Sequence, residues 1–87
     1  MKPAAVTPGD IVISRAGRDE GKYYAVLAIE SPDFVMLTDG DLRKLDRPKR
    51  KRIKHLKPTY QAISMETMQN DAGIRKALSA MKPEKEG

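Results

Sequence analysis

The stretch GDIVISRAGRDEGK at residues 9–22, followed by YYAVLAI at residues 23–29, decides the fold. Two runs of branched and aromatic residues, the composition typical of β-strands, flank a polar loop that two glycines bracket. Gly17 and Gly21 can adopt positive φ, which allows a tight connection between neighbouring strands. The stretch therefore predicts a strand at residues 11–13, a tight loop and a second strand at residues 23–29.

Further short strands are expected at close spacing. Ser31-Pro32-Asp33 ends the second strand, and FVMLT at residues 34–38 predicts a third. Asp39-Gly40 is a favoured dipeptide for a two-residue hairpin turn, so a fourth strand is expected at residues 41–45. Alternating apolar and polar residues predict a fifth strand at residues 53–57. Five short strands favour a mainly β fold, in which a small barrel closes the sheet.

The chain changes character after Pro58. The segment 60–69 is compatible with a short helix or an extended connection, and Asn70 or Asp71 can cap a helix that Pro83 ends. Apolar residues then recur at the spacing of one helical face: Ile74, Leu78 and Met81. We expect this C-terminal helix to pack on the barrel; a helix that binds a partner is the alternative, because methionine side chains adapt to varied contacts. The expected organisation is a tail at 1–7, a barrel at 8–58, a connection and helix at 59–83, and a disordered tail at 84–87.

Charge is distributed unevenly along the 87 residues, whose net charge is +5. The segment 43–57 contains nine Lys and Arg residues and one acidic residue, so it carries +8 and the remainder −3. A basic segment on a mildly acidic body attracts polyanions, either nucleic acid or acidic lipid. No apolar stretch is long enough for a signal peptide or a membrane span, so we expect a cytoplasmic protein that does not bind membranes.

The stretch that decides the fold also carries a family resemblance. Residues 9–22, followed by Val26, resemble the KOW motif: a strand, a glycine-bracketed loop with basic and acidic residues, and a strand with a core valine. Residues 34–40 followed by Arg43 are similar to the KOW ribosomal proteins of the archaeal and eukaryotic large subunit. The resemblance covers about residues 8–56. It implies an SH3-like barrel and, as a usual function of the family, RNA binding.

The resemblance also suggests a ligand and contact residues. RNA, foremost ribosomal RNA, would be the partner, with ribosomal proteins as further partners. The motif glycines are Gly9, Gly17 and Gly21, and the last two would let a sugar-phosphate chain approach the loop closely. Arg18 and Lys22 stand where they can contact phosphate oxygens. Many KOW motifs have another glycine where this chain has Tyr24, and this departure favours the archaeal and eukaryotic subgroup.

The basic run RPKRKR at residues 47–52 is the second feature that favours RNA. We expect it to form a loop between two strands and to present cations to phosphates; a solvated loop without a ligand is the alternative. Reversing residues 49–52 to glutamate is expected to abolish binding without unfolding the barrel. The predicted phosphate contacts of this region are Arg43, Lys49, Arg50, Lys51, Arg52 and Lys54.

Two further side chains are candidates for RNA contact. Tyr23 faces away from Tyr24 and Val26 on the strand, so it is the better tyrosine for stacking on a base. The alternative is that Tyr23 packs beneath the C-terminal helix. His55 is the only histidine and stands among lysines, where it can contact a phosphate or simply face solvent.

The sequence offers no catalytic constellation. It contains no cysteine, which excludes thiolate metal sites and a cysteine nucleophile, and no second histidine that could complete a metal site with His55. No residue pattern resembles a nucleophile beside a base. Asp39 and Asp41 flank Gly40 and suit a turn. We therefore expect no catalytic residue, no bound metal, no cofactor and no small-molecule substrate. The rival hypotheses are a protein-interaction module and a nucleic-acid binder linked to transcription.

Overall fold

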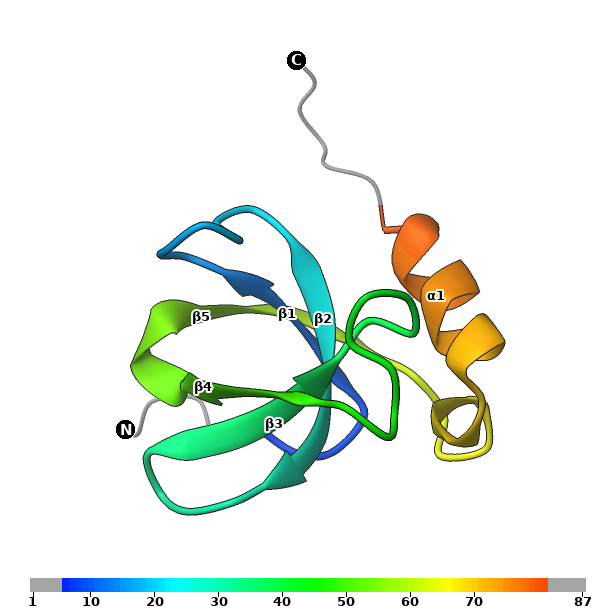
Figure 1. The fold of residues 1–87 in the computed structure, drawn as a ribbon, viewed down its shortest axis with the longest axis horizontal. Helices are drawn as coiled ribbons and strands as arrows, with labels where there is room; N and C mark the ends of the chain where they lie inside the picture. Colours follow the sequence, from blue (N-terminus) through cyan, green and yellow to red (C-terminus); the bar gives the residue numbers. More distant parts are fainter. Residues whose placement is uncertain (1–5, 82–87) are drawn as a thin grey trace.

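The computed structural model describes residues 6–81. Five antiparallel strands form one sheet: β1 (Asp10–Ser14), β2 (Tyr23–Ile29), β3 (Phe34–Thr38), β4 (Lys49–Arg52) and β5 (Leu56–Ala62). Their order across the sheet is β4-β3-β2-β1-β5 (Figure 1). A short 3₁₀ helix, η1 (Ile53–His55), connects the two edge strands. The prediction of a mainly β fold is thus confirmed.

The first three strands lie where the sequence predicts them. β1 pairs with β2 through Ile11↔Ala25 and Val12↔Tyr24, and β2 pairs with β3. Gly17 and Gly21 have φ angles of +87° and +91°, so the loop between β1 and β2 does use the conformations that glycine allows. Local pattern and turn chemistry were sufficient to place this part of the sheet.

The predicted strand at residues 41–45 is wrong, and Asp39-Gly40 does not form a hairpin. Residues 39–48 are irregular. One carboxylate oxygen of Asp39 accepts hydrogen bonds from the backbone N–H groups of Asp41 and Arg43, each at 2.8 Å. The Thr38 hydroxyl also donates to the Arg43 carbonyl at 2.6 Å. These local bonds occupy groups that a hairpin ladder would need, so the chain curls into a compact loop.

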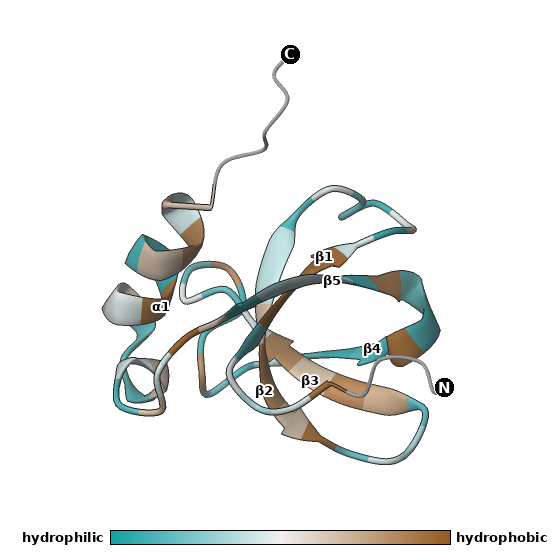
Figure 2. Cartoon of the chain, turned by 180° about the vertical axis from the view of Figure 1, so that it is seen from behind, coloured by the Kyte–Doolittle hydropathy of each residue, from teal (hydrophilic) through white to brown (hydrophobic). Residues whose placement is uncertain are grey.

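The basic run is a strand and not the expected loop. β4 pairs with β3 in the register Phe34↔Arg52 to Leu37↔Lys49, which satisfies backbone groups that β3 would otherwise leave open. Figure 2 shows β4 as a hydrophilic strand beside the more apolar β3. Four consecutive cations are tolerable here because β4 is an edge strand and successive side chains point to opposite faces.

The fifth strand is displaced from its predicted position. Residues 53–55, expected as its first half, form η1, and β5 runs from Leu56 to Ala62, past the expected end of the barrel at residue 58. Ile53 packs against the core from η1. The alternation of residues 53–57 therefore reflects a 3₁₀ turn followed by the start of a strand.

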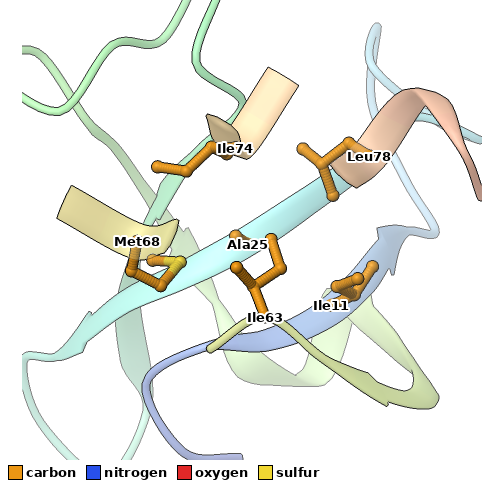
Figure 3. Close-up of a cluster of buried hydrophobic side chains, with 6 residues drawn as sticks. All are labelled: Ile11, Ala25, Ile63, Met68, Ile74 and Leu78. Atoms are coloured by element: carbon orange, nitrogen blue, oxygen red, sulfur yellow. The ribbon is translucent and has the colours of Figure 1, made fainter. Parts of the chain in front are cut away.

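Apolar residues are buried on both faces of the sheet. One cluster joins four strands, with β1, β2 and β3 contributing most of it: Val12, Tyr24, Val26, Val35, Leu37 and Leu56. The other lies between the opposite face and the C-terminal part of the chain (Figure 3): Ile11, Ala25, Ile63, Met68, Ile74 and Leu78. Because neighbours such as Ile11 and Val12 point to opposite faces, β1 contributes to both clusters.

The C-terminal segment forms η2 (Thr67–Gln69) and the helix α1 (Asp71–Ser79). Asn70 caps α1, since its side-chain oxygen accepts the N–H of Gly73 at 3.0 Å. Ile74 and Leu78 are buried and Met81 packs against them, so the predicted helical face does pack on the sheet. Pro83, the expected tail at 84–87 and most of the expected tail at 1–7 lie outside the described residues. No helix within residues 6–81 is long and apolar enough to cross a membrane.

Candidate nucleic-acid interface

The loop between β1 and β2 is organised around the carboxylate of Asp19. One oxygen accepts hydrogen bonds from the Ser14 hydroxyl at 2.9 Å and the Lys51 ammonium at 3.2 Å. The other accepts from the Tyr24 hydroxyl at 3.2 Å and lies 3.5 Å from the ammonium of Lys49. The Asp19 side chain is only 11% exposed. A single carboxylate thus ties the loop to β1, β2 and β4.

The environment of Asp19 keeps its carboxylate ionised. Burial raises its pKa, but the hydrogen bonds from Ser14 and Lys51 and the charges of Lys51 and Lys49 outweigh burial, so the pKa lies well below its usual range. Burial and the neighbouring Asp19 charge raise the pKa of Tyr24 to about 12. The Tyr24 hydroxyl therefore remains a donor to Asp19 at any physiological pH.

Two predicted phosphate contacts serve this internal network. The Lys51 side chain is 12% exposed, and its ammonium also donates to the Ala16 carbonyl at 3.1 Å. Lys49 is more accessible but pairs with the same carboxylate, Asp19. Reversing residues 49–52 to glutamate would place two carboxylates beside Asp19, so we now expect that change to destabilise the fold. The structure thus argues against using this reversal as a test of binding alone.

Cations from three segments meet over a shallow hollow of about 280 Å³. We call it the cationic hollow; its lining is Arg18, Asp19, Lys22, Tyr24, Leu42, Arg43 and Lys49. Four of these residues belong to the predicted set of phosphate contacts, and they come from the β1–β2 loop, the irregular loop 39–48 and β4. Asp19 is the one carboxylate in the lining, and Lys49 and Lys51 balance its charge. The hollow therefore presents a net positive surface.

The backbone beneath these cations is fixed. Lys22 donates its N–H to the Asp19 carbonyl at 2.9 Å, and its ammonium lies 6.0 Å from the centre of the Tyr24 ring. The Arg43 carbonyl accepts bonds from Thr38 and from the N–H of Asp39 at 2.9 Å. Arg18, Lys22 and Arg43 are exposed. Because hydrogen bonds tie the backbone of Lys22 and Arg43 in place, we expect a bound anion to order mainly side chains, which would limit the entropic cost of binding.

The opposite face of β4 presents a second cationic feature. The guanidinium carbons of Arg50 and Arg52 lie 3.7 Å and 4.9 Å from the centre of the Phe34 ring. Glu30 also forms an ion pair with Arg50. Stacking on an aromatic ring orients these planar groups, and the Nε–H of Arg50 is already used by Glu30. This arrangement could not be predicted from the sequence, because Phe34 and the arginines are adjacent only through the pairing of β3 with β4.

The other predicted contact residues lie elsewhere. Lys54 is exposed and His55 half-buried on η1, outside the lining of the cationic hollow. Tyr23 is half-buried and packs against the cluster beneath α1. Of the two expectations for Tyr23, the structure therefore shows packing beneath the C-terminal helix and not a ring free to stack on a base. Gly9 is buried at the start of β1, where its N–H donates to the Val26 carbonyl at 2.8 Å. Gly17 and Gly21 are exposed, and the space beside the α-carbon of Gly21 is open.

We expect Asp19→Asn to lower the free energy of unfolding by about 1–3 kcal/mol, because two lysines lose their charged partner. A carboxylate with a lowered pKa stabilises the fold above its unfolded pKa of about 4, and this contribution is lost as pH falls toward the folded pKa. The difference between wild type and variant should therefore narrow below about pH 4. Urea denaturation over this pH range measures it. Glu20→Gln, an exposed change in the same loop, is the control; an equal loss there would contradict the role of Asp19.

The chemistry of this surface is that of anion recognition. Arginine and lysine donate charged hydrogen bonds to phosphate or carboxylate oxygens. Within residues 6–81, no group of three or more acidic or histidine side chains is placed to hold a metal ion. A scan of known protein families found no family model that matches the chain.

Proposed function

We propose that this protein is a non-catalytic RNA-binding module of the KOW type, which contacts the RNA backbone through the cationic hollow. One observation carries the proposal: exposed Arg18, Lys22 and Arg43 converge from two separate loops on one hollow. These cations can bind phosphates, which carry the same charge along any RNA, so contacts of this kind do not depend on the base sequence. The resemblance of residues 9–22 to the KOW motif supports RNA as the polyanion.

The topology is compatible with an SH3-like barrel, which the KOW resemblance implies. η1 turns the chain between the two edge strands, and one apolar cluster includes residues of β1, β2, β3 and β5. A sheet that shares a single core among these strands is strongly curved, as the ribbon suggests (Figure 1). We propose that the fold is such a barrel, left partly open between β4 and β5.

The geometry of the cationic hollow favours a polynucleotide over a small anion. The hollow is open and shallow, and three of its cations, Arg18, Lys22 and Arg43, are exposed, so it can follow an extended chain of phosphates. The open space beside Gly21 lets a sugar-phosphate chain approach the loop. A site for a small anion would instead enclose its ligand. We propose ribosomal RNA as the ligand, ribosomal proteins as neighbours and the cytoplasm as the location, in line with the KOW resemblance.

A protein ligand is the second candidate, and one observation favours it. Leu42 is 73% exposed at the rim of the cationic hollow, and Met65 is 62% exposed beyond β5. Exposed apolar side chains beside charges are common at protein interfaces. Binding that resists salt would favour this candidate, whereas equal affinity for duplex DNA and structured RNA would favour a transcription-linked role.

Salt dependence tests the proposal. Because Asp19 engages Lys49 and Lys51, we expect three cations to neutralise phosphates: Arg18, Lys22 and Arg43. The logarithm of the affinity should then fall against the logarithm of salt concentration with a slope of about −2.7 for duplex RNA and about −2.1 for single strands. Fluorescence anisotropy with a labelled RNA hairpin between about 50 and 200 mM salt measures it. A slope near zero would contradict binding through phosphates.

A further inference from the structure

Tyr60 is held in an unusual position on β5. Val12 pairs with Pro58 and the adjacent Ile11 pairs with Gln61, so Thr59 and Tyr60 form a β-bulge. The φ angle of Tyr60 is +66°, and no other non-glycine residue among 6–81 has positive φ. Tyr60 is 86% exposed, more than any other large apolar residue among 6–81. The bulge thus presents an aromatic ring to solvent.

The bulge is built by specific hydrogen bonds. The Thr59 hydroxyl donates to the Ile11 carbonyl at 2.7 Å and accepts the Gln61 N–H at 3.1 Å. Left-handed backbone is unfavourable for a bulky side chain, and glycine or asparagine would fit it better. An exposed ring contributes little to the core, so folding alone does not explain a tyrosine here. Strained residues of this kind concentrate at binding sites.

A cationic surface continues from Tyr60 along β5 and η1. Three shallow hollows of about 200, 260 and 250 Å³ adjoin one another there. The first two share Val6 and Pro58, and the second and third share Ile53 and Lys54. We call this surface the β5 track; its exposed aromatic side chain is Tyr60, and its exposed cations are Arg15, Lys54 and Arg52.

The charges of the β5 track favour an anionic ligand. Two carboxylates also line it, Asp10 and Asp33. Asp10 lies in the same hollow as Tyr60, and one of its oxygens accepts the N–H of Thr7 at 2.8 Å, which leaves its negative charge in place. Three cations, Arg15, Lys54 and Arg52, thus outnumber the two carboxylates and leave the surface with a net charge of +1; Arg52 is stacked on Phe34 at the far end. An aromatic ring beside a line of cations matches the chemistry of a single-stranded nucleic acid.

We propose that the β5 track binds single-stranded RNA, with Tyr60 stacked on an unpaired base. Arg15, Lys54 and Arg52 would then contact the adjoining phosphates. The inference rests on the proposed function in taking RNA as the ligand, and it adds that unpaired nucleotides bind outside the cationic hollow. Stacking accepts every base, so this contact selects unpaired over paired RNA without reading sequence.

The first experiment uses Tyr60→Trp, which introduces a tryptophan into a chain that has none. We expect unstructured oligouridine to quench the tryptophan fluorescence to saturation, and a blunt RNA duplex to quench it far less. Anisotropy of the same labelled RNAs reports binding independently of stacking. Oligouridine that binds without quenching the fluorescence would overturn the inference.

Three further variants separate stacking from other roles of the ring. Tyr60→Asn fits left-handed backbone but lacks a ring, and it should weaken binding of oligouridine about fivefold to 100-fold. Duplex binding and the thermal midpoint should not fall. Tyr60→Phe should bind oligouridine as wild type does. Tyr60→Leu should behave like Tyr60→Asn; if it binds as wild type does, the ring acts as apolar surface, which contradicts stacking and favours a protein ligand.

The two proposals fail in different ways. If the wild-type protein binds neither oligouridine nor duplex RNA, the proposed function fails together with this inference. If it binds both and Tyr60→Asn leaves both affinities unchanged, the β5 track is not a stacking site, while the cationic hollow stands.

Discussion

Replacing Arg18, Lys22 and Arg43 together by glutamate is expected to lower the affinity for structured RNA by about 100-fold to 1,000-fold near 0.1 M salt. Each cation that releases counterions adds about 0.9 to the salt slope on duplex RNA, so their removal also flattens the slope toward zero. The three side chains are exposed, and none of them pairs with Asp19. The variant should therefore fold, which circular dichroism checks.

A matched reversal distinguishes a site from general attraction. Arg47, Lys57 and Lys76 are exposed and lie outside the lining of the cationic hollow. Changing them to glutamate alters the net charge by the same amount, and we expect it to weaken RNA binding less than tenfold, by loss of long-range attraction alone. Anisotropy titrations of both triple variants against one RNA hairpin make the comparison. Equal losses of affinity in the two variants would mean that RNA binding depends on net charge alone and that the cationic hollow is not a binding site.

Gly40→Ala is expected to lower the free energy of unfolding by about 3 kcal/mol or more, the largest effect of a single substitution that we predict. Gly40 is buried, has φ of +74° and lies against the start of α1. A β-carbon there would overlap the Asp71 carbonyl and approach the Arg75 backbone nitrogen to 2.8 Å. Backbone atoms in a helix cannot yield as a side chain can, so α1 would have to move off the loop.

Gly21→Ala is the control for backbone conformation. Gly21 has φ of +91°, but nothing lies within 4 Å of the place of its β-carbon. Only the cost of a left-handed alanine applies there, about 1–2 kcal/mol. Urea denaturation of both variants isolates the effect of the overlap at Gly40. Equal destabilisation would contradict the close packing of α1 on this loop.

Local patterns predicted much of the fold. The first three strands follow from their branched residues and turns, and the packed face of α1 follows from Ile74 and Leu78 at helical spacing. The positive φ of Gly17 and Gly21 also follows from sequence. In each of these cases the determining residues lie within one turn or one strand of each other.

The features that sequence could not predict depend on contacts between distant residues. Lys49 and Arg50 look equally free in the sequence, yet one pairs with Asp19 and the other stacks on Phe34. The side chains of β4 alternate between more buried and more exposed positions, but the sequence shows no apolar–polar alternation because all four residues are cations. Asp39-Gly40 has hairpin chemistry, but the Asp39 carboxylate diverts the amides of the next residues. The bulge that exposes Tyr60 could not be predicted from sequence either, because it depends on how β5 pairs with β1.

The most direct test of RNA binding through the cationic hollow is a nuclear magnetic resonance titration of the isotope-labelled 9.7 kDa protein with a structured RNA hairpin. We predict that backbone amide signals shift at residues 17–22 and 41–44, and at Lys49, at low salt and return on adding salt. The exposed face of α1 should not respond. Shifts confined to α1, or binding that produces no shift in the two loops, would contradict the assignment of the cationic hollow as the RNA site.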